Sequence, residues 1–180
     1  MDADGKIEYA LLAGGCFWCV EAAYEGLAGI LEAVSGYAGG PASADLESPS
    51  YEQVCSGRTG HAEAVRLTFD PSKISYVEIL DRFWKIHDPT SLNRQGADVG
   101  TQYRSAVFYL DETQRAAAEA SMSAEAKRLG RPLATELVPA PRFWPAEDWH
   151  QGYYRKHPEA GYCRAVIAPK LAKLALKSLP

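Results

Sequence analysis

A cysteine placed between a strand and a helix constrains this chain more than any other feature of its sequence. Residues 9–13 form an apolar run typical of a strand, two glycines follow, and the segment from Cys16 onward has helical character. The free backbone N–H groups and the dipole of a helix N-terminus favour an anion. We therefore expect the pKa of Cys16 to be lowered, which would make its thiolate a nucleophile at neutral pH. Phe17 and Trp18 would line an apolar pocket beside the sulfur.

The size and charge of the chain exclude several broad classes of protein. Its 180 residues fit a single domain, which we divide into a core of about residues 6–157 and a C-terminal tail of about residues 158–180. A net charge of −4 without a basic block argues against a nucleic-acid partner. No apolar run approaches the ~18 residues of a membrane span. The polar N-terminus does not resemble a secretory signal, so we expect a cytoplasmic location.

Strands and helices intermix along the chain without a regular βα alternation, which predicts an α+β domain with a small mixed sheet. Ser75 and Glu78 form a capping-box pattern at the start of one helix. The segments expected to be strands are 6–13, 30–37, 61–69, 103–110 and 133–138. The segments expected to be helices are 16–26, 75–87, 111–129, 143–156 and 170–177. The irregular segments between them are 41–60, 91–102 and the turn-rich 157–165.

Four cysteines are too few for a disulfide scaffold and suggest catalysis instead. Cys16 and Cys19 have the spacing of a redox pair, although Cys19 equally fits a small packed residue on the helix. Zinc is disfavoured because only this pair is closely spaced. Cys55 is expected to be buried and inert. Cys163 lies in a tail that we expect to be mobile, so it could reach an oxidised Cys16.

Four other polar residues are candidates for the same site. Glu63 lies in an apolar strand, where burial would raise the pKa of its carboxyl and allow it to donate a proton. Taken singly, each candidate also fits a structural role. Glu63 could face solvent from its strand, Asp98 could form a turn, and Tyr51 and Tyr103 could be packing residues.

Eight ordered blocks between about residues 7 and 163 resemble the A-type peptide-methionine sulfoxide reductases. The resemblance implies a two-layer α/β sandwich around a small mixed sheet, with a ferredoxin-like core and an irregular C-terminal segment. The blocks are Gly15–Trp18, Gly36–Gly40, Tyr51–Gly57, Thr59–Glu63, His87–Thr90, Asn93–Gly96, Asp98–Ser105 and Pro145–Asp148.

The resemblance also implies a reaction, the reduction of methionine S-sulfoxide, free or in proteins, to methionine. Cys16 would attack the sulfoxide sulfur. Gly15, Phe17 and Trp18 would bind the substrate, with the two aromatic rings around its S-methyl group. The implied biological role is repair of proteins under oxidative stress.

The remaining polar residues acquire roles through the same resemblance. Glu63 would protonate the sulfoxide oxygen, and Tyr51 and Tyr103 would donate hydrogen bonds to it. Asp98 would belong to the same polar network. A neutral carboxylic acid is useful here because the oxygen is a poor leaving group until it is protonated.

Turnover requires a second thiol, and Cys163 matches the family's resolving cysteine. Attack would leave a Cys16 sulfenic acid, which Cys163 would convert to a disulfide that thioredoxin or a related dithiol reduces. We expect a monomer without a bound cofactor or metal. Cys19 stands where the family commonly has glycine, and no cysteine follows Cys163. We expect a single resolving step through Cys163, with Cys19 as the alternate or relay thiol.

Two alternatives to this function remain open at the level of sequence. A thiol–disulfide oxidoreductase using Cys16 and Cys19 would keep its activity after Cys163→Ser and lose it after Cys19→Ser. A module that binds oxidised methionine without reducing it would have an unreactive Cys16.

Overall fold

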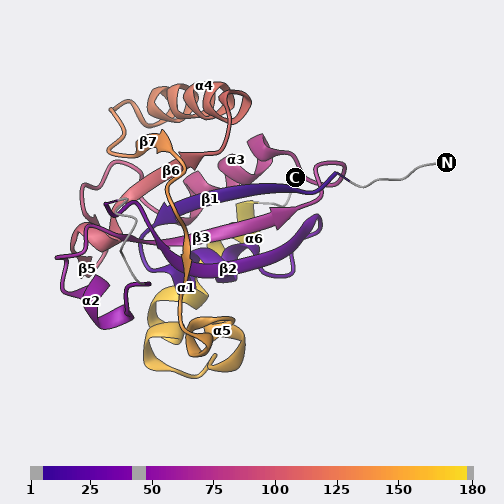
Figure 1. The fold of residues 1–180 in the computed structure, drawn as a ribbon. Helices are drawn as coiled ribbons and strands as arrows, with labels where there is room; N and C mark the ends of the chain where they lie inside the picture. Colours follow the sequence, from indigo (N-terminus) through magenta and orange to yellow (C-terminus); the bar gives the residue numbers. More distant parts are fainter. Residues whose placement is uncertain (1–5, 42–47, 178–180) are drawn as a thin grey trace.

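A computed structural model describes residues 6–41 and 48–177 as a mixed sheet with helices (Figure 1). The sheet has six strands in the order β7-β6-β1-β3-β2-β8. β6 and β7 pair in parallel and the other neighbours antiparallel, so the α+β class and the mixed sheet are confirmed. The strands are β1 (Glu8–Gly14), β2 (Ile30–Ala38), β3 (Ala62–Phe69), β6 (Ser105–Tyr109), β7 (Glu136–Pro139) and β8 (Trp144–Pro145), and a separate hairpin joins β4 (Arg94–Gln95) to β5 (Asp98–Val99).

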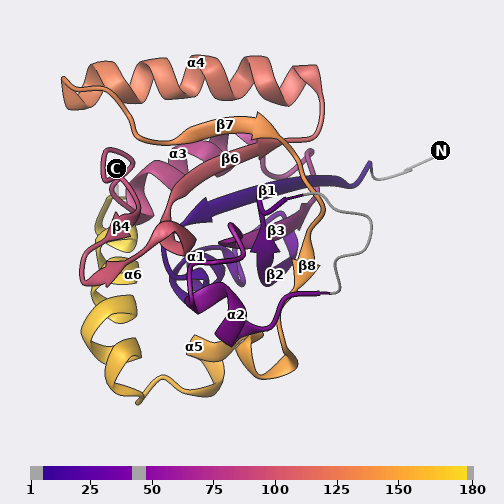
Figure 2. The same ribbon diagram turned by 60° about the vertical axis from the view of Figure 1, so that its left-hand side comes forward.

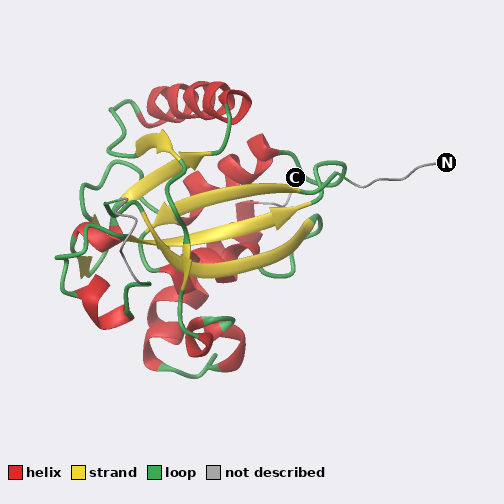
Figure 3. Ribbon diagram, in the orientation of Figure 1, coloured by secondary structure: helices red, strands yellow, loops and turns green. Residues whose placement is uncertain are grey.

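Helices cover one face of this sheet, whereas an extended segment crosses the other. Figure 3 shows helices behind the strands and others above, below and beside the sheet, and Figure 2 shows α4 along the edge formed by β6 and β7. The helices are α1 (Phe17–Tyr24), α2 (Tyr51–Cys55), α3 (Tyr76–Ile86), α4 (Glu112–Leu129), α5 (Tyr153–Lys156) and α6 (Ala168–Lys177). Short 3₁₀ turns η1 (Thr101–Tyr103) and η2 (Asp148–His150) and a π-helical turn η3 (Cys163–Ile167) complete the structure. None of the helices among the described residues has the length and apolar character to cross a bilayer.

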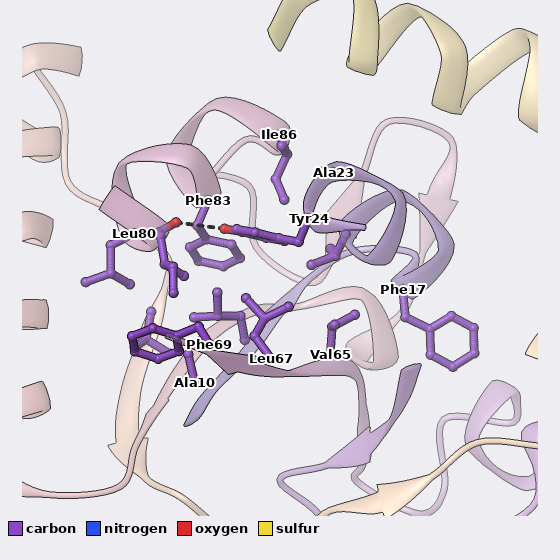
Figure 4. Packing of buried hydrophobic residues seen from close by; sticks show 14 of the residues in the cluster. Ala10, Phe17, Ala23, Tyr24, Val65, Leu67, Phe69, Leu80, Phe83 and Ile86 are labelled. Atoms are coloured by element: carbon purple, nitrogen blue, oxygen red, sulfur yellow. Dashed lines mark hydrogen bonds between the residues drawn. The ribbon is translucent and has the colours of Figure 1, made fainter. Parts of the chain in front are cut away.

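The central strand β1 is apolar because both of its faces are buried. Ala10 and Leu12 belong to the cluster under the helices, whereas Leu11 and Ala13 belong to the cluster on the opposite face. In the helix-side core, shown in Figure 4, the Tyr24 hydroxyl of α1 donates a hydrogen bond to a backbone carbonyl of α3 at 2.7 Å. This bond ties together the two helices that cover β1 and β3.

β3 follows the alternation expected from its sequence. Val65, Leu67 and Phe69 all lie in the helix-side core, and Glu63 has the same parity along the strand. The carboxyl group of Glu63 is therefore directed toward the helical layer and not toward solvent. This register brings an acid from the sheet to the N-terminus of α1.

The predicted start of α3 is confirmed by a reciprocal cap. The Glu78 backbone N–H donates to the Ser75 hydroxyl, and the Ser75 backbone N–H donates to the Glu78 carboxylate at 2.8 Å. Apolar residues then recur on the buried face of the helix. The expected helix therefore forms almost over its predicted range.

Several segments differ from expectation. The predicted loop 41–60 contains the helix α2, which Ser50 and Gln53 cap reciprocally; residues 42–47 lie outside the described part of the chain. The predicted helix 143–156 is divided into β8, η2 and α5. Pro145 lies in an edge strand, and Gly152 has a φ of 61°, so neither continues a helix.

The C-terminal segment is more regular than expected. η3 and α6 form a helical stretch that lies beside α1, yellow in Figure 2. Ile167 and Leu174 are buried, which explains the order: an apolar face of the segment packs against the body of the protein. The segment around Cys163, expected to be irregular, is helical in the structure, and the helix expected over residues 170–177 is confirmed. The mobility of this segment stays a prediction. The termini 1–5 and 178–180 lie outside the described residues.

Candidate active site

A cavity of about 170 Å³ lies at the N-terminus of α1. It brings together residues from α1, α2, β3, the β4–β5 hairpin, η1 and the C-terminal segment. Seven of its eight lining residues are candidates from the sequence, and the eighth, Tyr162, is not. The lining residues are Cys16, Phe17, Trp18, Tyr51, Glu63, Asp98, Tyr103 and Tyr162.

Gly15 holds Cys16 in place but does not itself line the cavity. Its φ is 92°, a conformation that favours glycine. A Cβ atom at this position would lie 2.6 Å from Cγ of Gln95. The Gln95 amide in turn donates to the Asp88 carbonyl at 2.8 Å and accepts from the Asp88 N–H at 2.9 Å. The close approach that the glycine permits is thus to Gln95, and its predicted substrate contact stays a prediction.

Cys16 is the N-cap residue of α1 and is only 7% exposed. Burial raises its pKa well above the usual thiol value, with further contributions from a hydrogen bond to the Cys19 thiol and from the Glu63 charge. The expectation of a lowered pKa was therefore wrong. The first N–H of the helix, on Phe17, donates to the Glu63 carboxyl at 2.9 Å instead of facing a thiolate. Desolvation consequently outweighs the helix dipole at this sulfur.

Glu63 is 2% exposed and accepts that hydrogen bond through Oε2. Burial raises the pKa of its carboxyl to about 8, although the Phe17 N–H partly opposes the shift. The predicted rise in pKa is confirmed. At neutral pH the carboxyl is mostly protonated, so it can donate a proton into the cavity beside Cys16.

Tyr51 and Tyr103 reach the cavity from different elements. Tyr51 begins α2, and its backbone N–H donates to the Glu147 carboxylate at 2.9 Å, which anchors the helix. Tyr103 ends η1. Burial is the largest cause that raises the pKa of both phenols, so both remain protonated hydrogen-bond donors. Together with Glu63 they supply three O–H donors to one small cavity.

The aromatic wall is held from behind by η2 and α5. The Trp18 indole stacks on Tyr153 with ring centres 3.7 Å apart, and its N–H donates to Nδ1 of His150 at 3.0 Å. Phe17 meets the His150 ring edge-on at 4.8 Å. His150 is fully buried, and burial lowers its pKa to about 4, so it is neutral and can accept the indole hydrogen bond. The rings of Phe17 and Trp18 are therefore held in place by contacts with η2 and α5.

The C-terminal segment closes the opposite side. The Tyr162 hydroxyl donates to the Asp98 carboxylate at 2.6 Å, which ties this segment to the β4–β5 hairpin. The next residue, Cys163, is fully buried and shares one apolar cluster with Cys16 and Cys19. All three are free thiols. The fold thus brings Cys163 to the surroundings of Cys16, as predicted, but from a packed helical turn.

Cys19 has an environment unlike that of Cys16. It is 3% exposed, and its sulfur lies 3.6 Å from Nζ of Lys170 and 3.9 Å from the Tyr162 hydroxyl. The hydrogen bond from Cys16 and the Lys170 charge lower the pKa of Cys19 to about 7, against an opposing effect of burial. Cys55, by contrast, is only half-buried and lies outside the cavity lining.

Sequence reasoning missed five supporting residues: Tyr162, Glu147, His150, Gln95 and Lys170. Tyr162, Glu147 and Gln95 lie within segments that were singled out for their neighbours, so the signal was present but assigned to other positions. His150 and Lys170 had no distinguishing context, because their contacts span more than a hundred residues of chain. Within the described ranges, no group of three or more His, Cys, Asp or Glu side chains is arranged to hold a metal ion.

Comparisons with known proteins agree with this geometry. The chain is 53% identical to the peptide methionine sulfoxide reductase MsrA of Thermus thermophilus over 174 residues, which cover 96% of this chain and 97% of that protein. Among solved structures it is similar to reduced Mxr1 of Saccharomyces cerevisiae, with a TM-score of 0.83, 34% identity, and coverage of 91% of this chain and 92% of that one.

Mxr1 in complex with Trx2 is also similar in fold, with a TM-score of 0.59, 24% identity, and coverage of 85% of this chain and 88% of that one. The family description "peptide methionine sulfoxide reductase" matches residues 8–179. This match and the 53% identity to a full-length MsrA show that the chain belongs to the MsrA family of peptide methionine sulfoxide reductases, a family of oxidoreductases.

Proposed function

We propose that the cavity binds the S epimer of methionine sulfoxide in one orientation. The S-methyl group packs against Phe17 and Trp18, and the oxygen faces the O–H groups of Glu63, Tyr51 and Tyr103. The observation that carries this proposal is a protonated, buried carboxyl in the same small cavity as a cysteine thiol. An apolar wall opposite a polar one discriminates between epimers, because exchanging methyl and oxygen would bury the oxygen against carbon.

The reductive step transfers the sulfoxide oxygen to Cys16. Glu63 donates its proton to the oxygen, and the Cys16 sulfur attacks the sulfoxide sulfur. The bond between that sulfur and the oxygen breaks, the oxygen passes to Cys16, and the methionine sulfur keeps the electron pair. The products are methionine and a Cys16 sulfenic acid, and the proton of the original thiol restores Glu63. The raised pKa of Cys16 fits this order, since the thiol keeps its proton until substrate is bound.

The oxidised enzyme is then returned to its thiol form. Cys163 forms a disulfide with Cys16 and releases water, and a dithiol protein reduces the disulfide. The shared cluster of the two cysteines supports the pairing, and the solved complex of Mxr1 with Trx2 supports a thioredoxin as reductant. We propose free methionine sulfoxide and oxidised proteins as substrates, with no bound cofactor. The monomeric state and the cytoplasmic location stay predictions.

A reduction assay with dithiothreitol tests the central claim. Free and peptide-bound methionine S-sulfoxide and R-sulfoxide are offered to the wild type, to Cys16→Ser, and to Cys55→Ser as a matched control outside the cavity. We expect reduction of the S epimer by the wild type and by Cys55→Ser, and none by Cys16→Ser. Activity retained by Cys16→Ser, or equal reduction of both epimers, would contradict the proposal.

A further inference from the structure

A groove of about 510 Å³ adjoins the catalytic cavity and is not used by the proposed reaction. It lies between the end of α3, the β4–β5 hairpin and the C-terminal segment, on the side of the molecule where β4 and α6 are labelled in Figure 2. Its volume is in the range of ligand-binding clefts. Asp98 and Tyr162 line both the groove and the cavity, so the two spaces meet at this pair of residues. A polypeptide whose oxidised methionine occupies the cavity can therefore continue along the groove.

Three lysines give this groove its charge. Lys85 lies in the last turn of α3, and Lys170 and Lys173 are three residues apart on α6, where such residues are neighbours on the helix surface. Leu171 and Leu174 of the same helix pack against the helix-side core, which leaves the lysines on the adjacent face. Among the salt bridges of the described residues, none involves any of the three lysines. Their ammonium groups are therefore available to an acidic ligand.

The two aspartates that line the groove already have hydrogen-bond partners. Asp98 accepts from the Tyr162 hydroxyl at 2.6 Å, and Asp88 accepts from the N–H and the hydroxyl of Thr90 at 2.9 and 2.6 Å. His87 also lines the groove but adds no charge at neutral pH, because burial lowers its pKa to about 4. The groove thus carries an excess of positive charge on a chain whose net charge is −4. Such a local reversal of sign favours a negatively charged ligand.

We propose that this groove binds an acidic side chain of a protein substrate, close in sequence to the oxidised methionine, so that the enzyme favours acidic segments of oxidised proteins. The inference rests on the proposed function, because it requires the sulfoxide to occupy the cavity beside Cys16. The substrate carboxylate pairs with the exposed ammonium groups of Lys85 and Lys173, whereas Lys170 also donates to the Cys19 sulfur at 3.6 Å. Free methionine sulfoxide has no neighbouring residues and cannot use the groove.

The size and the kinetic form of the preference follow from the exposure of these lysines. Exposed ion pairs are individually weak and are screened by salt. With two such pairs, kcat/KM for a peptide that carries glutamate should exceed that for its glutamine twin by about 3–10-fold at low ionic strength. The ratio should approach one near 1 M salt, where charges are screened over about 3 Å. Because the pairs form equally in the ground and transition states, the difference should appear in KM and not in kcat.

A set of peptide substrates tests the preference on the full-length protein. Each peptide carries one methionine S-sulfoxide in an otherwise neutral sequence, with glutamate, glutamine or lysine at one of the neighbouring positions on either side. Dithiothreitol is the reductant, so docking of a dithiol protein does not affect the rates. We expect the glutamate peptides to be preferred at positions on one side of the sulfoxide, because the groove meets the cavity at Asp98 and Tyr162 only. Lysine at the same positions should be disfavoured.

Charge-reversal variants connect the preference to the groove. The double variant Lys85→Glu/Lys173→Glu should reverse the ratio, so that the lysine peptide is preferred over the glutamate peptide. The single variants Lys85→Gln and Lys173→Gln should each lower the glutamate-to-glutamine ratio by about 2–3-fold and provide the test if the double variant does not fold. Lys127→Glu is the matched control: Lys127 is an exposed lysine in the last turn of α4, outside the groove, and its ratio should equal that of the wild type. Lys170 is left unchanged because it contacts the Cys19 sulfur.

The outcomes distinguish this inference from the proposed function. Equal kcat/KM for the glutamate and glutamine peptides at every position overturns the inference, as does the same change of ratio in Lys127→Glu and the groove variants. If the groove variants change only the KM for thioredoxin in a coupled assay and leave the peptide ratio intact, the groove serves the reductant and the inference is wrong. Failure of the proposed function itself would appear as no reduction of any peptide by the wild type.

Discussion

The two sides of the cavity differ in the chemistry that their charges support. On the sheet side, β3 presents Glu63 as a buried acid that accepts a hydrogen bond from the Phe17 N–H, and burial keeps it protonated. On the C-terminal side, α6 presents Lys170 to Cys19, and the cation favours a deprotonated sulfur. In the proposed function, the sheet side therefore supplies a proton to the sulfoxide oxygen, while the C-terminal side holds thiols. Burial dominates the pKa of Glu63, whereas at Cys19 the hydrogen bond from Cys16 and the charge of Lys170 outweigh burial.

Among the variants that test this comparison, Glu63→Gln should have the largest effect on activity. We expect the single-turnover rate of methionine formation to fall by about 10²–10³-fold, because general acid catalysis is lost while the shape of the side chain is kept. Glu21→Gln is a matched control: Glu21 is also buried with a raised pKa, but it accepts from the Gly152 N–H outside the cavity. Equal losses in the two variants would mean that burial, and not proton donation, matters.

The pH dependence of the reductive step is the next largest effect. Since the pKa of Glu63 is raised to about 8, the rate should be level below that value and fall about tenfold per pH unit above it. A single-turnover pH profile measures this, and Glu63→Gln should remove the inflection. A rate that rises through pH 8 would instead indicate that ionisation of Cys16 limits the step.

The free energy of unfolding should depend on pH through the ionisation of Glu63, and the direction of that dependence is defined. The folded protein binds the Glu63 proton more tightly than the unfolded chain does, so this contribution is present at low pH and is lost as pH rises from about 5 toward 8. The difference in unfolding free energy between the wild type and Glu63→Gln should therefore shift against the wild type across that range. Urea unfolding at several pH values checks the direction.

The tyrosines give a smaller test of the oxygen-binding wall. Tyr51→Phe and Tyr103→Phe each remove one hydroxyl, and we expect each to slow methionine formation by about 5–10-fold, as loss of one hydrogen bond of about 1 kcal/mol implies. Tyr109→Phe, in β6 outside the cavity, is the control. Because both hydroxyls are placed on the same oxygen, the double variant should be less than multiplicative.

Tyr162→Phe should have the smallest effect on the reaction rates, and it should act on the C-terminal side of the cavity. It removes the 2.6 Å bond to Asp98 that anchors the residue before Cys163. We expect the formation of the Cys16–Cys163 disulfide to change by about 2–5-fold, in line with one hydrogen bond, and methionine formation to change less. Quenched disulfide mapping measures both. A larger effect on methionine formation would place Tyr162 with the oxygen-binding residues.

Local patterns were sufficient for several parts of the fold and the site. Alternation along residues 61–69 predicted the strand β3 and the face shared by Val65, Leu67 and Phe69, and the Ser75 pattern predicted the start of α3. A raised pKa of Glu63 was predicted from its apolar strand, whereas the alternative that it faces solvent was decided only by the structure. The strand, its shared face and the helix start depend on a residue's immediate neighbours, so a single sequence carries them.

The prediction for Cys16 failed for a reason that a sequence does not contain. The helix N-terminus was located correctly, but its first N–H group is occupied by Glu63, which is 46 residues away from Phe17. The order of the C-terminal segment also depends on a distant surface, since Cys163 and Ile167 are buried in the cluster around Cys16. Both outcomes depend on which residues, distant from one another in the sequence, pack together in the folded protein.

The sequence by itself therefore determined most of the longer strands and helices, the junction that carries Cys16, and, through resemblance, the family. Tertiary structure alone decided the ionisation of the two neighbouring thiols. Cys16 and Cys19 lie on the same helical turn, yet their pKa values move in opposite directions. The physical reason is that burial is the largest effect on the pKa of Cys16, whereas at Cys19 the hydrogen bond from Cys16 and the charge of Lys170 outweigh burial.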